Sequence, residues 1–254
     1  PTVTLAAQSA VCAGAPAFTL TGGSPVGGTY SGTGVNSTTG EFNPSTAGAG
    51  THTITYSFTD GNSCSNSATQ NITVHPQPTV TIGTLSAVCI DNGLVALSSG
   101  SPTPGTYSGT GVSGTNFNPQ TAGVGTHTIT YTHTDGNSCT DSASTNITVN
   151  ALPNVSLAAI ADVCVNASPV TLSGGLPAGG TYSGTGVNST TGVFTPSTAG
   201  VGTHKITYTY SDANGCEDTA SQNITVNPQP TVTLAAQSAV CAGAPAFTLT
   251  GGSP

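Results

Sequence analysis

The chain has 254 residues, of which only 4% are charged, and one Lys or Arg stands against nine acids for a net charge of −8. Nucleic-acid binding is excluded by this balance, because a phosphate backbone is held mainly by Lys and Arg. No run of about 18 consecutive apolar residues occurs, so the sequence predicts no membrane span.

The sequence repeats itself at intervals of 75 to 77 residues, with segments that begin at Pro1, Pro78, Pro153 and Pro230. Residues 1–25 and 230–254 are identical, which makes the larger unit a triplet of repeats. We expect the chain to be a window of a much longer array, consistent with the absence of an initiator Met and of a signal peptide.

Within a repeat, apolar residues alternate with hydroxyl residues, which is typical of half-buried strands. The clearest case is 51–59, where His52, Ile54, Tyr56 and Phe58 share one face. In chain order, the expected strands of the first repeat lie at Val3 and Leu5, Phe18 and Leu20, Tyr30, Phe42, 51–59, and Ile72 and Val74. No stretch predicts a helix.

About seven short strands in about 75 residues, separated by Gly-rich turns, predict a β-sandwich. The predicted fold class is all-β, with tandem immunoglobulin-like β-sandwich domains, one disulfide per domain, arranged as an elongated string. Short linkers that contain Pro favour extended backbone between the domains. The predicted domains are repeats 1, 2 and 3 at 1–76, 77–152 and 153–229, with the start of a fourth at 230–254.

Seven cysteines are placed so that each complete repeat has one near its start and one near its end. A zinc site is disfavoured, because no close C-x-x-C pair exists and each repeat holds only two thiols. Closing a loop of about 50 residues contributes roughly 4 kcal/mol in the chain-entropy model. The predicted disulfides clip one end of each sandwich and indicate an oxidising, extracellular compartment. They are Cys12–Cys64, Cys89–Cys139 and Cys164–Cys216, with Cys241 unpaired.

Two residue types recur at positions where chemistry is conceivable. His52, His127 and His204 begin equivalent strands without a second ligand at suitable spacing, so we expect each imidazole to need one hydrogen bond. A second set precedes the second cysteine of each repeat and consists of Asp60, Asp135 and Asp212. Calcium would need several carboxylates, and an Asx turn is the preferred interpretation.

No catalytic or metal-binding residues and no cofactor are predicted, and we expect the protein not to be an enzyme. A nucleophilic hydroxyl needs a base and an orienting group that converge on it, and no such motif recurs. An isopeptide bond would need a Lys in every domain, whereas Lys205 stands alone. The Thr faces of the alternating strands suit ice-binding ladders poorly, because sandwich sheets twist.

A family resemblance rests on an ordered set of motifs. Gly-Thr-Tyr-Ser-Gly-Thr-Gly-Val at 28–35 is followed by Gly-Glu-Phe-Asn-Pro at 40–44 and by Ala-Gly-Ala-Gly-Thr-His-Thr-Ile-Thr-Tyr at 47–56. The chain resembles the tandem Ig-like repeats of giant surface proteins of Bacteroidota, including the gliding-motility adhesins exported by type IX secretion. Two segments also resemble the short O-glycosylation signal of those bacteria, which makes Ser142 and Thr219 candidate glycan sites.

The sequence therefore predicts a non-catalytic structural segment, a stalk or filament, of a very long extracellular adhesin or cell-surface fibre. Its partners would be neighbouring repeats of the same chain. Two alternatives stay open: a glycan- or surface-binding Ig-like module of a secreted protein, in which the loop at 31–35 contacts polysaccharide, and a multi-chain extracellular fibre subunit with lateral copies.

Overall fold

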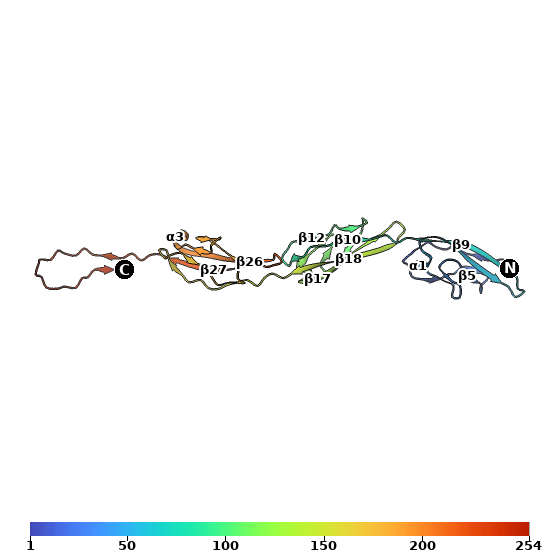
Figure 1. Cartoon of the computed structure of the whole chain (residues 1–254), viewed down its shortest axis with the longest axis horizontal. Helices are drawn as coiled ribbons and strands as arrows, with labels where there is room; N and C mark the ends of the chain where they lie inside the picture. Colours follow the sequence, from blue (N-terminus) through green and yellow to red (C-terminus); the bar gives the residue numbers. More distant parts are fainter. Residues whose placement is uncertain (254) are drawn as a thin grey trace. The chain divides into compact units, whose positions relative to one another are not determined.

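The computed structural model describes residues 1–253, and nearly all of their regular structure is β. The chain divides into two units, Pro1–Val149 and Asn150–Pro254. The first unit holds repeats 1 and 2, and the second holds repeat 3 and the segment that follows it. Figure 1 labels the second long strand of each repeat, β9, β18 and β27.

The three repeats are built from equivalent elements. Repeat 1 contains β1 (Thr4–Leu5), β2 (Val11–Cys12), β3 (Phe18–Thr19), β4 (Gly23–Ser24), β5 (Thr29–Ser31), β6 (Val35–Asn36), β7 (Glu41–Phe42), α1 (Pro44–Ala47), β8 (Gly50–Thr59) and β9 (Ser65–His75). Repeat 2 contains β10 (Thr81–Ile82), β11 (Val88–Cys89), β12 (Val95–Ala96), β13 (Gly100–Ser101), β14 (Thr106–Ser108), β15 (Val112–Ser113), β16 (Asn116–Phe117), α2 (Pro119–Ala122), β17 (Gly125–Thr134) and β18 (Thr140–Asn150).

Repeat 3 follows the same order in the second unit. It contains β19 (Ser156–Leu157), β20 (Val163–Cys164), β21 (Val170–Thr171), β22 (Gly175–Leu176), β23 (Thr181–Ser183), β24 (Val187–Asn188), β25 (Val193–Phe194), α3 (Pro196–Ala199), β26 (Gly202–Ser211) and β27 (Glu217–Asn227). After repeat 3 come β28 (Thr233–Leu234) and β29 (Gly252–Ser253), which pair with each other.

Each repeat is an Ig-like β-sandwich, and the corresponding sheets of the three repeats have the same strand order. In repeat 1 a four-stranded sheet of order β2-β9-β8-β5 faces a three-stranded sheet β3-β7-β6 and a pair β1-β4. The long strands β8 and β9 form a ten-rung antiparallel hairpin, from Gly50 opposite Val74 to Thr59 opposite Ser65. The short strand β2 pairs in parallel with the end of β9. The predicted all-β sandwich class is confirmed.

The apolar core of each repeat lies between its sheets, as the alternation predicts. In β8, Ile54 and Tyr56 are buried and His52 and Phe58 are half-buried, while Thr53 between them is exposed. Tyr56 is held at both ends of a turn, because its hydroxyl donates to the Pro25 carbonyl and accepts from Gly28 N–H. A Cβ on Gly28 would collide with the Tyr56 ring, so this turn requires glycine.

The prediction that no helix occurs is wrong, because α1, α2 and α3 are each four residues long. A capping residue and a proline together explain them. The side chain of Asn43 accepts hydrogen bonds from the N–H groups of Ser45 and Thr46, and Pro44 supplies a helical φ at the first position. One turn is too short to show a helical period in the sequence.

Candidate functional site

The first cysteine of repeat 1 lies where the repeat ends. Cys12 is in β2, which runs parallel to the last residues of β9, with Cys12 opposite His75. The N–H of Ala13 donates to the His75 carbonyl at 2.8 Å and fixes this register. We call this the linker end of the repeat, since residues 76–80 lead from here into repeat 2.

The second cysteine of repeat 1 lies at the opposite end, which we call the turn end. Cys64 closes the turn between β8 and β9, where Asp60 Oδ1 accepts the N–H groups of Asn62 and Cys64. Equivalent turns are closed by Asp135 before Cys139 and by Asp212 before Cys216. The predicted Asx-turn role of these aspartates is confirmed.

The two ends are separated by the length of β9. Its eleven residues rise by about 3.3 Å each. Cys64 and His75, the residue opposite Cys12, are therefore roughly 35 Å apart along the strand. A disulfide needs Cα atoms within about 7 Å. Two cysteines of one repeat therefore cannot meet. The same holds in repeat 3. There Cys164 lies opposite Asn227 in the sheet, and Asn227 is at the end of β27 that is far from Cys216.

The structure instead joins successive repeats. Cys12 at the linker end of repeat 1 forms a disulfide with Cys139 at the turn end of repeat 2, with a Cα–Cα distance of 5.5 Å. Cys89 and Cys216 are also disulfide-bonded, whereas Cys64, Cys164 and Cys241 are free and exposed. The predicted pairings Cys12–Cys64, Cys89–Cys139 and Cys164–Cys216 are wrong for the reason just given.

Further contacts surround this bond, and together with it they form the junction of repeats 1 and 2. The side-chain N–H of Gln77 in the linker donates to the Thr140 carbonyl at 3.2 Å. Gln77 lies so close to Gly14 that a Cβ there would overlap it. The prediction that neighbouring repeats contact each other is confirmed for repeats 1 and 2. Sequence reasoning missed Gln77, which carries no recognisable motif.

Electrostatics adds to this junction. The pKa of Asp135 is lowered, chiefly because its carboxylate accepts the Cys139 N–H, with further contributions from Asn137 and from the nearby His75 of repeat 1. In repeat 3 the pKa of Asp212 is lowered by the Cys216 N–H first, then by Asn214 and Gly215, without a histidine. Ionised aspartates therefore brace both turns.

The recurrent histidines each make one structural hydrogen bond. The Nε2 atom of His52 lies 2.8 Å from the Gly48 carbonyl, and His127 and His204 repeat this contact with Gly123 and Gly200. The single-hydrogen-bond interpretation is confirmed. Within residues 1–253, no group of three or more His, Cys, Asp or Glu side chains is arranged to hold a metal ion.

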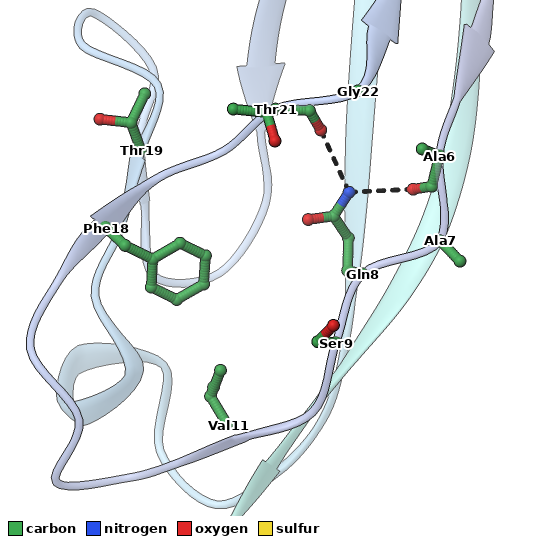
Figure 2. A pocket seen from close by; sticks show the side chains of 9 residues that line it. All are labelled: Ala6, Ala7, Gln8, Ser9, Val11, Phe18, Thr19, Thr21 and Gly22. Carbon is green, nitrogen blue, oxygen red and sulfur yellow. Dashed lines mark hydrogen bonds between the residues drawn. The ribbon is translucent and has the colours of Figure 1, made fainter.

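A hollow of about 340 Å³ opens beside the first strands of repeat 1 (Figure 2). Gln8 crosses it, and its side-chain N–H donates to the carbonyls of Ala6 and Thr21. Phe18 and Val11 lie beneath, among small residues. The residues that correspond to Gln8 in repeats 2 and 3 are Leu85 and Ile160, and each packs on the core of its repeat instead. The hollow carries no charged group and is a local variation in packing.

The candidate glycan sites lie on the second long strands. Ser142 on β18 and Thr219 on β27 are both exposed. Each has its backbone N–H bonded to the preceding aspartate, Asp141 or Asp218. The structure leaves both hydroxyls accessible for modification.

No helix in the described part of the chain is long and apolar enough to cross a membrane.

No family model and no curated protein matches the sequence. Among solved structures, the chain is similar to a Ca2+-stabilized adhesin that helps an Antarctic bacterium reach out and bind ice, at 16% identity over 92% of this chain and 76% of that one, with a TM-score of 0.35. It is also similar to the cis-dimer of protocadherin gammaB7 EC3-6, at 15% identity over 89% and 73% of the two chains, with a TM-score of 0.24. For Sidekick-1 immunoglobulin domains 1–5 the values are 14% identity, 90% and 59% coverage, and a TM-score of 0.25.

Proposed function

We propose that this chain is a structural segment, a stalk or filament, of a long extracellular adhesin or cell-surface fibre, and that it is not an enzyme. The observation that carries the proposal is the Cys12–Cys139 disulfide. A bond within one repeat stabilises that repeat alone. A bond between two repeats ties one to the next and carries tension past the linker.

The polar chemistry of the repeats supports the same role. The recurrent aspartates hold the turns that present the second cysteines, and the recurrent histidines bond to glycine carbonyls. Disulfides persist in oxidising compartments, which supports an extracellular location. The motif resemblance supports export to the surface of a Bacteroidota cell through type IX secretion. A chain with one Lys or Arg also offers almost no cleavage site to trypsin-like proteases.

Stretching single molecules by their two ends tests the proposed function. With Cys12–Cys139 intact, the residues between the two cysteines lie outside the path of the force. Their sequence separation of 127 residues corresponds to roughly 45 nm of extended chain at about 3.5 Å per residue. We expect unfolding of the oxidised chain to withhold this length. Reduction, which also frees Cys89 and Cys216, should release at least this length.

The matched control is Cys12→Ser, which should lengthen the oxidised chain without a reductant, by less than full reduction does because Cys89 and Cys216 stay bonded. Cys64→Ser removes a free thiol and should leave the oxidised trace unchanged. Equal contour lengths before and after reduction of the unmodified chain would show that the junction does not carry force between the repeats.

We also propose O-linked glycans on Ser142 and Thr219, and domain boundaries after residues 76, 152 and 229. Sugar on exposed strand faces would help keep a protein with few charges in solution. Mass spectrometry of the chain isolated from its native source should find a glycan on both peptides. Finding only unmodified peptides over both segments would remove this part of the proposal.

A further inference from the structure

Two free cysteines lie at complementary positions in this chain. Cys64 is at the turn end of repeat 1, and Cys164 is at the linker end of repeat 3. The Cys12–Cys139 bond joins one position of each of these two kinds. The two free thiols thus occupy, on separate repeats, a linker-end and a turn-end position, the same two kinds of position that the observed disulfide joins.

Cys164 is held as Cys12 is. Its strand β20 runs parallel to β27, with Cys164 opposite Asn227, and the N–H of Val165 donates to the Asn227 carbonyl at 2.9 Å. In repeat 1 the corresponding register sets Cys12 opposite His75. The backbone of repeat 3 therefore presents its first cysteine at the linker end, ready for the turn end of a further repeat.

Cys64 is held as Cys139 is. In the two turns the aspartate oxygen accepts the N–H of the cysteine at 3.0 and 2.9 Å, and the residue before each cysteine has a φ of 65° and 64°. The surroundings differ, because Cys139 is 0% exposed and Cys64 is exposed. The turn is thus preformed, and burial of its cysteine accompanies bonding to the neighbouring repeat.

The segment after repeat 3 indicates which partner fits. Residues 230–254 are identical to residues 1–25. Val232 and Leu234 are 75% and 67% exposed, whereas the equivalent Val3 and Leu5 are 9% and 6% exposed within repeat 1. This segment has the apolar residues that begin repeat 1, but here they do not pack on long strands.

We propose that Cys164 and Cys64 are the two halves of one more junction, whose occupant is a second copy of this sequence in tandem. Cys164 of one copy bonds to Cys64 of the next. Cys64 and Cys164, the two free cysteines of the three complete repeats, then both belong to a bond between successive repeats. This inference rests on the proposed structural function and extends it from one junction to the whole array.

The bond forms by thiol–disulfide exchange with a low-molecular-weight disulfide such as oxidised glutathione. The thiolate of Cys64 attacks the external disulfide and releases one glutathione thiol. The thiolate of Cys164 then attacks the mixed disulfide and releases the second. The two cysteines are oxidised by two electrons, one external disulfide is reduced to two thiols, and their protons pass to solvent and to the released thiolates.

A tandem protein tests the proposal: residues 1–229 followed directly by the full 254-residue chain, refolded in a glutathione buffer. Free thiols are labelled with iodoacetamide and the peptides are mapped by mass spectrometry. We expect Cys164 of the first copy to be joined to Cys64 of the second, with labelling of both reduced by at least about tenfold, as expected for an intramolecular pair. The single chain, diluted in the same buffer, should label at both residues.

The control variant carries Cys64→Ser in the second copy only. It should restore labelling of Cys164 in the first copy and leave Cys12 joined to Cys139. Full labelling of Cys164 and Cys64 at the tandem boundary, or a bond from Cys164 to any other cysteine, would overturn the proposal. Either result leaves the stretching experiment on Cys12–Cys139 to judge the proposed function separately.

Discussion

The turns that end in Cys64 and Cys139 have the same local structure, but only one of the two cysteines is bonded to a neighbouring repeat. Both are closed by an aspartate that accepts the N–H of the cysteine. Cys139 is buried in a bond to Cys12 of the preceding repeat, whereas Cys64 is a free, exposed thiol. The local sequence therefore builds the turn, and the neighbouring repeat decides what its cysteine does.

The largest expected effect comes from replacing one cysteine of this comparison at a time. Cys139→Ser opens a loop of 127 residues, whose closure is worth about 5 kcal/mol in the chain-entropy model. Repeats 1 and 2 should melt at a clearly lower temperature, as measured by calorimetry. Cys64→Ser should leave the melting curve unchanged. Equal losses from the two substitutions would contradict the assignment of the bond.

A smaller effect should be equal in the two repeats, because it arises far from the cysteines. Asn43→Ala and Asn118→Ala each remove a helix cap that accepts two backbone N–H groups. Each should cost about 1 kcal/mol in chemical denaturation. Thr195 occupies the same position in repeat 3 without a capping hydrogen bond, so Thr195→Ala should cost less. A loss of stability from only one of the two substitutions would show that the junction between repeats 1 and 2 affects the helix caps.

The smallest effect concerns pH. The pKa of Asp135 is lowered in the folded protein, so the stability from this carboxylate is present above about pH 4, near the ordinary Asp pKa. It is lost as the pH falls through the folded value. Because His75 contributes, His75→Ala should raise the pKa of Asp135 slightly in an NMR titration. The pKa of Asp212, which has no histidine among its causes, should stay where it is. A shift at both aspartates would contradict a direct effect of His75.

Much of the fold follows from short-range pattern. The alternation over 51–59 predicts β8 and its buried face, and the Asp-Gly-Asn segment predicts the turn that follows. The helix α1 escapes notice because one turn gives no period. The two-residue strands escape for a similar reason, since only their partners define them.

The disulfide pattern could not be obtained from cysteine counting. Two cysteines per repeat suggest a bond within the repeat, but Cys12 is placed by a parallel pairing with β9, more than 60 residues away in sequence. The signal that was available is the uninterrupted strand from Ser65 to His75. Its length places Cys64 at one end of the repeat, far from the linker, and only the position of β2 was needed to exclude the pair.

The most direct test of the account is disulfide mapping of the oxidised 254-residue chain, with free thiols blocked before digestion. Cleavage after Tyr and Phe by chymotrypsin suits a chain that has almost no site for trypsin. The account predicts a peptide that joins Cys12 to Cys139 and a blocked thiol at Cys64. A peptide that joins Cys12 to Cys64 would contradict it.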